Sequence, residues 1–207
     1  YPSDASISSI NEKTYWVKTD GKYQLYNLSD PKKPVIEEEF TRATRFMSGV
    51  AVVSNPNQQI RIINTKGKTI ATLGKDIKKC YEFTVNGYAI IENADDLRGI
   101  IDNKGNIVIR PAYVLLNISN DNIVWAQKNK DDKVLLTMDI KGKKLGEIST
   151  DKYELLTYAY HEEKILVKET NNDDGYLIVM DKAGKKLFNI KKAKKNLWGS
   201  YYINGYL

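Results

Sequence analysis

Three pairs of aspartates, each beside asparagine, are the side chains best suited to hold a metal ion. Ca²⁺ prefers about six to eight oxygen ligands, so pairs gathered on one face would form a calcium site or a polar ligand face. The spacing matches no known calcium loop, and Asp and Asn are also ordinary residues of solvated hairpin loops. We therefore expect no cofactor and keep calcium as the one candidate. The pairs are Asp95 and Asp96, Asp131 and Asp132, and Asp173 and Asp174.

Catalytic groups are sparse. The single histidine, His161, precedes Glu162 and Glu163 at an expected hairpin tip, where an imidazole lacks the pocket and partner of a general base. The single cysteine, Cys80, excludes an internal disulfide and fits a small buried residue better than a nucleophile. One alternative stays open: a glycan-processing enzyme whose paired carboxylates would lie on the central axis of the β-propeller that the repeats described below predict. Repeats without long insertions do not favour it, so we expect no enzyme.

Aromatic side chains indicate two environments. Trp16 and Trp125 stand at equivalent places among Val and Ala, which favours core packing. Trp198, Tyr202 and Tyr206 lie near the end of the chain, beside asparagine. Aromatic faces next to such side chains stack on sugar rings, but a sealed core seam uses the same residues. The three are therefore candidate contacts for a ligand.

The basic charge is carried by lysine. The net charge is +6, with only five arginines among the 32 basic residues. Nucleic-acid readers favour arginine, whose planar fork pairs with phosphate and guanine, so a nucleic-acid partner is not expected. Many lysines flank the turns of the repeat described below, and a lysine-rich face that binds an anionic polymer is a further alternative. Solvated turns have the same composition.

A polar residue recurs along the chain and opens a tight turn each time. The spacings are 37, 38, 37 and 42 residues, for Asn27, Asn64, Asp102, Asp139 and Asp181. Asx at this position accepts a hydrogen bond from the backbone two residues on, and glycine tolerates the positive φ of a tight hairpin. The residue that closes each turn follows three positions later: Asp30, Gly67, Gly105, Gly142 and Gly184.

Short apolar segments flank every turn and predict strands. A further pair precedes each hairpin, with first members expected at 44–46 and 81–83, and Pro111 is expected to end the strand before it. The fold class is therefore all-β, with repeats of about 38 residues that each form an antiparallel meander. We expect one domain, 1–207, folded as a five-bladed β-propeller, with an open β-repeat array as the alternative. The units are 1–39, 40–77, 78–111, 112–150 and 151–193, and 194–207 supplies a closing strand.

One repeat resembles the bacterial WG (KWG) repeats. The segment from Gly99 to Tyr113 carries the pattern Gly-Ile-Ile-Asp, Gly105, Val-Ile, Pro111 and Tyr, and Gly87 opens the preceding Gly-x-Ala-x-Ile segment. The signature Trp is absent, and Arg98 stands in its place. The resemblance implies an exported or surface-attached bacterial repeat protein and supplies no catalytic residues.

These observations favour a binding or scaffold module over an enzyme. The chain begins at Tyr1 rather than Met, which we interpret as a secretory leader removed upstream, with a lipid anchor there as an option. No apolar run of about 18 residues occurs, so no transmembrane segment is expected. We expect an exported monomer, in the periplasm or at the cell surface, that recognises a protein or glycan through one loop face.

Overall fold

The structure is a computed structural model of residues 1–207, and it describes residues 5–11, 13–155, 163–170 and 176–191. Within these ranges the chain forms twenty β-strands and no helix. The chain divides into two compact units, 1–111 and 112–207, and each is described by itself. A search of the described residues for a helix long and apolar enough to span a membrane found none.

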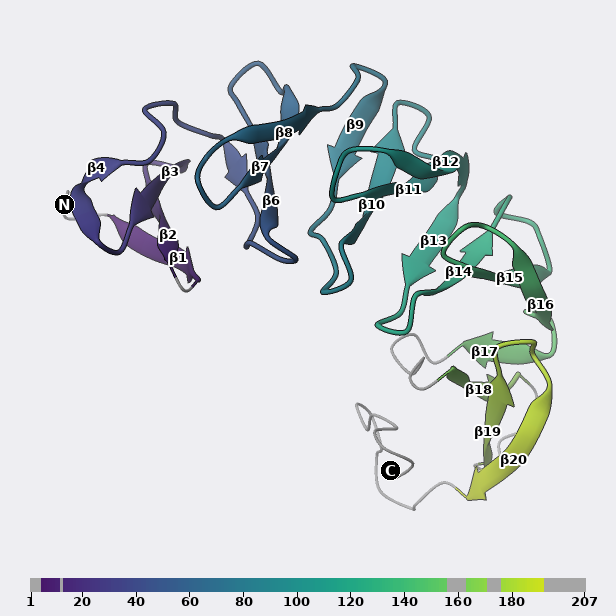
Figure 1. The fold of residues 1–207 in the computed structure, drawn as a ribbon. Helices are drawn as coiled ribbons and strands as arrows, with labels where there is room; N and C mark the ends of the chain where they lie inside the picture. Colours follow the sequence, from purple (N-terminus) through teal and green to yellow (C-terminus); the bar gives the residue numbers. More distant parts are fainter. Residues whose placement is uncertain (1–4, 12, 156–162, 171–175, 192–207) are drawn as a thin grey trace. The chain divides into compact units, whose positions relative to one another are not determined.

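Unit 1 contains three four-stranded antiparallel sheets, here called blades 1 to 3, in which the strands lie in chain order (Figure 1). Blade 1 comprises β1 (Ser6–Ile10), β2 (Thr14–Thr19), β3 (Lys22–Asn27) and β4 (Asp30–Pro34). Blade 2 comprises β5 (Arg42–Ala43), β6 (Val50–Ser54), β7 (Ile60–Asn64) and β8 (Thr69–Thr72). Blade 3 comprises β9 (Ile77–Cys80), β10 (Tyr88–Asn93), β11 (Arg98–Asp102) and β12 (Ile107–Tyr113).

Unit 2 contains two sheets of the same kind, blades 4 and 5. Blade 4 comprises β13 (Leu115–Ile118), β14 (Ile123–Gln127), β15 (Val134–Asp139) and β16 (Lys144–Ser149). Blade 5 comprises β17 (Tyr153–Leu155), β18 (Lys164–Glu169), β19 (Tyr176–Asp181) and β20 (Lys186–Lys191). The predicted all-β repeat architecture is confirmed: the described residues form five four-stranded antiparallel meanders.

The second strands of blades 1, 2 and 4 are buried on both faces. Residues 14–17 in β2, 50–53 in β6 and 123–126 in β14 are each buried without interruption. A strand with one solvated face would alternate buried and exposed residues, so an unbroken buried run requires cover on both sides. The fourth strands β4 and β8 are mostly exposed, as edge strands usually are.

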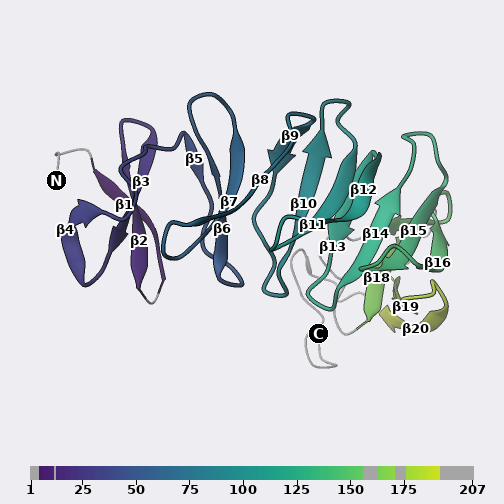
Figure 2. The same cartoon turned by 45° about the horizontal axis from the view of Figure 1, so that its top comes forward.

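In unit 1 the blades pack face to face (Figure 2). Blades 1 and 2 share a cluster in which Trp16, 1% exposed, meets the edge of Phe40 and stacks on Phe46. Blades 2 and 3 share a second cluster, built mainly from aliphatic residues of β6, β7, β10 and β11. Cys80 lies within it, and burial raises the pKa of its thiol to about 12. The predicted burial of Trp16 and of Cys80 is therefore confirmed.

Arginines of unit 1 join neighbouring blades. Arg61 pairs with Glu38 and lies over the ring of Phe40. Arg45 bonds Glu82 through both Nε and Nη2, at 3.0 and 2.5 Å. Arg42 Nη1 donates to the carbonyl oxygen of Cys80 at 2.7 Å. These three arginines bond to residues of the neighbouring blade or its connection, and so help to hold the blades together.

In unit 2 the facing surfaces of blades 4 and 5 form one apolar cluster. Trp125, Ile123 and Leu135 come from blade 4, and Ile165 and Met180 from blade 5. Trp125 is 7% exposed, which confirms its predicted place in the core.

Two local predictions are wrong. Pro111 does not end its strand, because β12 runs on to Tyr113. β12 lies at the outer edge of its sheet, where a residue without an N–H is tolerated. The first strands of blades 2 and 3 lie earlier than 44–46 and 81–83. Phe46 and Phe83 supplied the apolar signal, and both pack into the core from the connection that follows the strand.

The closing strand predicted for 194–207 lies outside the described residues. The closure of the five blades into a ring therefore stays a prediction, as does the single domain 1–207.

Candidate functional site

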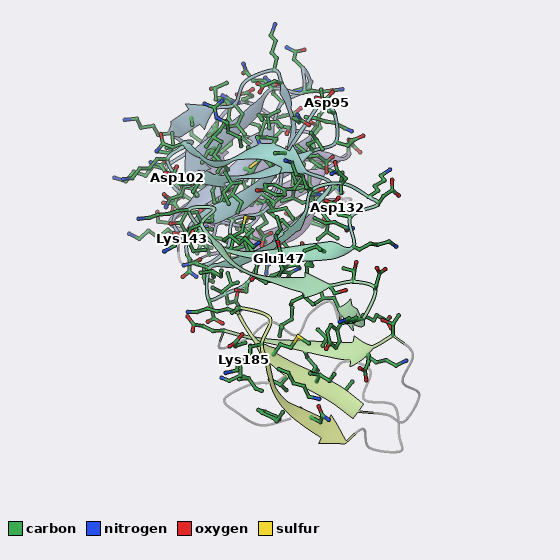
Figure 3. All side chains as sticks on the ribbon, turned by 90° about the vertical axis from the view of Figure 1, so that its right-hand side faces the viewer. Asp95, Asp102, Asp132, Lys143, Glu147 and Lys185 are labelled. Atoms are coloured by element: carbon green, nitrogen blue, oxygen red, sulfur yellow. The ribbon has the colours of Figure 1, made fainter. Side chains whose placement is uncertain are left out.

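Each blade has two chemically different ends. We call the end where the third strand turns into the fourth the turn end. The opposite end, where the second strand connects to the third and the fourth leads into the next blade, is the loop end. Figure 3 shows this separation in blade 4, where Asp132 lies at the loop end and Lys143 at the turn end.

The turn end repeats one set of hydrogen bonds. In blade 3, Asp102 Oδ1 accepts the backbone N–H groups of Lys104 and Asn106 at 2.9 and 2.8 Å, and Gly105, at φ 91°, closes the turn. The turns that begin at Asn64, Asp139 and Asp181 have the same two side-chain bonds. The predicted Asx turn is therefore confirmed in blades 2 to 5.

Blade 1 departs from this pattern. Asn27 Oδ1 accepts the N–H of Ser29 at 2.9 Å, but Asp30 does not adopt the left-handed conformation. Asp30 already belongs to β4 and its carboxylate bonds the N–H of Lys32 at 3.3 Å. The prediction that Asp30 closes this turn as a glycine does is wrong, because an L side chain disfavours positive φ.

The turns pack on the outer strand of the preceding blade. In unit 2, Gly184 lies against the carbonyl of Glu147, and Gly146 lies against the backbone of Ala183, so neither position has room for a methyl group. Thr137 Oγ1 donates to the carbonyl of Lys182 at 2.5 Å. In unit 1, a methyl group at Gly105 would meet the side chain of Ala71. The turn-end backbone is thus used to join blades.

Hydrogen bonding at the turn end also lowers the pKa of Asp102. Partial burial alone would raise the pKa of Asp102, but bonds from Asn106 and from the N–H of Lys104 outweigh it. The pKa of Asp102 therefore lies below its ordinary value. The charged form of this carboxylate is the one that the turn stabilises.

Asp95 and Asp96, two of the aspartates predicted as a calcium or ligand face, lie in a loop that Asn93 closes. Asp95 stands in an Asx turn in which Asn93 Oδ1 accepts the N–H groups of Asp95 and Leu97 at 3.1 and 2.9 Å. Asp96, at φ 62°, forms an ion pair with Lys78. The Asp95 carboxylate accepts from the side-chain amide of Asn93 at 3.4 Å.

The acidic loop of blade 4 is closed in a similar way. Asp132 Oδ2 accepts the N–H of Asn129 at 2.9 Å, and this bond lowers the pKa of Asp132. Asp131 is exposed. Among the described residues, no three His, Cys, Asp or Glu side chains lie close enough to hold a metal ion. The predicted residues Asp173, Asp174, Trp198, Tyr202, Tyr206 and His161 lie outside the described ranges.

A polar groove opens at the loop end of unit 1 and has a volume of about 570 Å³. One wall is the β6–β7 loop, residues 55–59, and the other is the β8–β9 link, residues 73–76. Ile60, Leu73 and Ile77 form an aliphatic floor. The N–H of Leu73 donates to the carbonyl of Ile60 at 2.9 Å, which fixes the link against the loop.

Side-chain amides line the rim of this groove. Asn55 holds the loop, since its Oδ1 accepts the N–H of Gln59 at 3.0 Å and its carbonyl accepts that of Gln58 at 2.9 Å. Gln58 lies at φ 60°, an unusual conformation for a residue with a side chain. Asn57, Gln58 and Gln59 are exposed, and within the described part of the chain their side-chain amides have no hydrogen-bond partner.

Two lysines border the groove and differ in their surroundings. Lys78 pairs with Asp96 and lies 4.0 Å from Glu92, which raises the pKa of the lysine. Lys75 has no acidic partner among the described residues. The neighbouring Asp76 turns its carboxylate toward Gly74. Lys75 is therefore the cation that the groove leaves available.

Arg98 stands at the position of the signature Trp and, like Lys78, lies near Glu92. Arg98 Nε lies 3.6 Å from Glu92 Oε2, and its guanidinium lies 6.0 Å from the ring centre of Tyr81. Tyr81 also donates its hydroxyl to Glu92 at 3.2 Å. Glu92, 7% exposed, is thus satisfied by its neighbours. The signature position is thus occupied by a guanidinium that lies over the Tyr81 ring.

A second, apolar groove of about 380 Å³ lies on blade 1. Ile7 and Ile10, each 64% exposed, border it together with Tyr15 and Val17. It carries none of the unpaired polar groups found in the first groove.

Sequence reasoning missed the groove. The second wall, residues 73–78, carries no motif. The signal was the cluster Asn55, Asn57, Gln58 and Gln59, which is more polar than a tight hairpin requires.

A family model described as WG containing repeat matches residues 99–130, which confirms the resemblance over that stretch. A search of curated proteins found no match to the chain.

Solved structures show the fold. A eukaryotic initiation factor is 14% identical with TM-score 0.57, covering 91% of this chain and 54% of that one. KlHsv2 with loop 6CD replaced by a Gly-Ser linker is 11% identical with TM-score 0.53, covering 88% and 64%. The C-terminal WD40 domain of Sif2 is 11% identical with TM-score 0.50, covering 94% and 62%. The chain thus spans 54% to 64% of the length of these proteins. WD40 repeats are blades of β-propellers, and the sheets described above are blades of this type.

Proposed function

We propose that this chain is a non-enzymatic binding or scaffold module that recognises a protein or a glycan through the loop end of its blades. The observation that carries the proposal is the groove between residues 55–59 and 73–78, where unpaired amides surround an aliphatic floor. A concave site with a few convergent polar groups over an apolar base is typical of ligand recognition.

Two further observations support a binding role. The turn-end backbone joins blades, whereas residues 57–59 at the loop end are exposed. The carboxylates of Asp95, Asp96 and Asp132 bond to Asn93, Lys78 and Asn129, within or beside their own loops. The resemblance to WG repeats supports an exported bacterial setting for the module.

The test presents the immobilised chain with two panels, a library of short random peptides and an array of bacterial polysaccharides. The groove variant combines Asn57→Ala and Gln59→Ala, and the control combines Lys66→Ala and Lys68→Ala at the turn end of the same blade. We expect the wild type and the control to retain the same ligands and the groove variant to lose them. Ligands lost only by the control, or no ligand from either panel, would contradict the proposal.

A further inference from the structure

We propose that the groove takes an extended peptide segment in which an aliphatic side chain stands next to an acidic one. This inference rests on the proposed function and narrows it to one class of ligand. Three properties of the groove support it: its amides, its floor and Lys75, which has no acidic partner among the described residues.

The amides match a peptide backbone. A side-chain amide offers N–H donors and a carbonyl acceptor, the same groups that a polypeptide presents along its length. An extended segment exposes these groups on its edges and directs alternate side chains to opposite sides. The free amides of Asn57, Gln58 and Gln59 follow one another along the wall, so they can bond successive peptide groups.

The floor matches an aliphatic side chain. Ile60 and Ile77, 5% and 7% exposed, belong to the core cluster of blades 2 and 3, and Leu73 packs against them. No aromatic ring occurs among the residues that line this part of the described chain. Sugar rings are commonly bound by stacking on aromatic faces, so the floor favours a branched side chain over a sugar.

The charge selects an acid. Lys78 is neutralised by Asp96, whereas Lys75 has no acidic partner in the described ranges and lines the same groove. A ligand carboxylate beside the aliphatic anchor would pair with Lys75. Since this pair would be exposed, we expect it to change affinity by about two- to fivefold.

The loop is already arranged for binding. Asn55 fixes the N–H of Gln59, and Gln58 already holds the left-handed conformation. A loop that is ordered before binding loses less conformational freedom when the ligand arrives. The peptide therefore meets a preformed wall of amides.

The experiment enriches a random peptide library on the wild type, on Lys75→Glu and on the matched control Lys66→Glu at the turn end. Circular dichroism and melting establish that each variant is folded, and Lys75→Gln serves as a neutral second variant. We expect wild type and Lys66→Glu to enrich peptides with Asp or Glu next to Leu, Ile or Val. Lys75→Glu should replace the acid with Lys or Arg, and Lys75→Gln should weaken the acidic peptides about two- to fivefold.

Peptides without an acid, or an unchanged consensus on Lys75→Glu, would overturn this inference and leave the proposed function in place. Retention of polysaccharides but no peptides would do the same. Retention of neither class would contradict both.

Discussion

At the turn end, the turns beginning at Asn64, Asp102, Asp139 and Asp181 repeat the same two side-chain bonds, and the backbone packs on the preceding blade. At the loop end, Asn55 and Asn93 close their loops with the same bond to the N–H four residues on, and Asp132 closes the β14–β15 loop. Within the described part of the chain the side-chain amides of residues 57–59 have no hydrogen-bond partner. The turn-end backbone meets a neighbouring blade, whereas these loop-end amides face solvent. The comparison assigns stability to one end and recognition to the other.

The largest expected effect is at a glycine that meets a neighbouring blade. Gly184 and Gly21 have φ values of 79° and 76°, but an added methyl group would meet the Glu147 carbonyl at Gly184 and nothing within 4 Å at Gly21. Gly21→Ala should lower the free energy of unfolding by about 1–2 kcal/mol, the cost of the left-handed conformation. Gly184→Ala should lose about 1–3 kcal/mol more through overpacking, measured by urea denaturation. Equal losses would contradict the packing of turns on blades.

The next effect is the loss of an Asx turn. Asp139 Oδ1 accepts the N–H groups of Lys141 and Lys143, both at 2.9 Å. Asp139→Ala should lower the free energy of unfolding by about 0.5–1.5 kcal/mol for each bond. Asp139→Asn should be close to wild type, because Asn64 makes the same bonds in blade 2. A loss in the asparagine variant as large as in alanine would show that the turn depends on charge.

A smaller effect depends on pH. The folded-state pKa of Asp102 is lowered, so its stabilisation is complete above the unfolded-state value of about 3.9 and is lost as pH falls through the folded pKa. Asp102→Asn keeps the turn but cannot titrate. The variant should therefore lose less stability than wild type between neutral pH and that acidic window, as thermal melts at a series of pH values would measure. Parallel pH profiles would contradict a stabilising role for the charge.

Local chemistry was predictable from the sequence. The Asx and Gly positions of the turns needed only residues three apart, and the burial of Trp16 and Trp125 needed only the apolar residues around them. The turns are set within one hairpin. The burial of each tryptophan is completed by the neighbouring blade, but the apolar residues beside it in the sequence were enough to indicate it.

Features that combine separate segments were not predictable. The first strands of blades 2 and 3 were placed too late because Phe46 and Phe83 pack in the core clusters without belonging to a strand. Pro111 was misjudged because its tolerance depends on the edge position of β12. The groove joins Asn57 to Lys75 across a complete hairpin, and no local pattern marks that meeting.

The most direct test measures melting and ligand retention together, in one variant from each end. The loop-end variant combines Asn57→Ala and Gln59→Ala, and the turn-end variant is Asp139→Ala. The loop-end variant should stay within about 0.5 kcal/mol of wild type but lose the peptides or polysaccharides that wild type retains. The turn-end variant should melt at a lower temperature and, below that temperature, retain the same ligands. A loop-end variant that melts early, or a folded turn-end variant that loses the ligands, would contradict the division between the two ends.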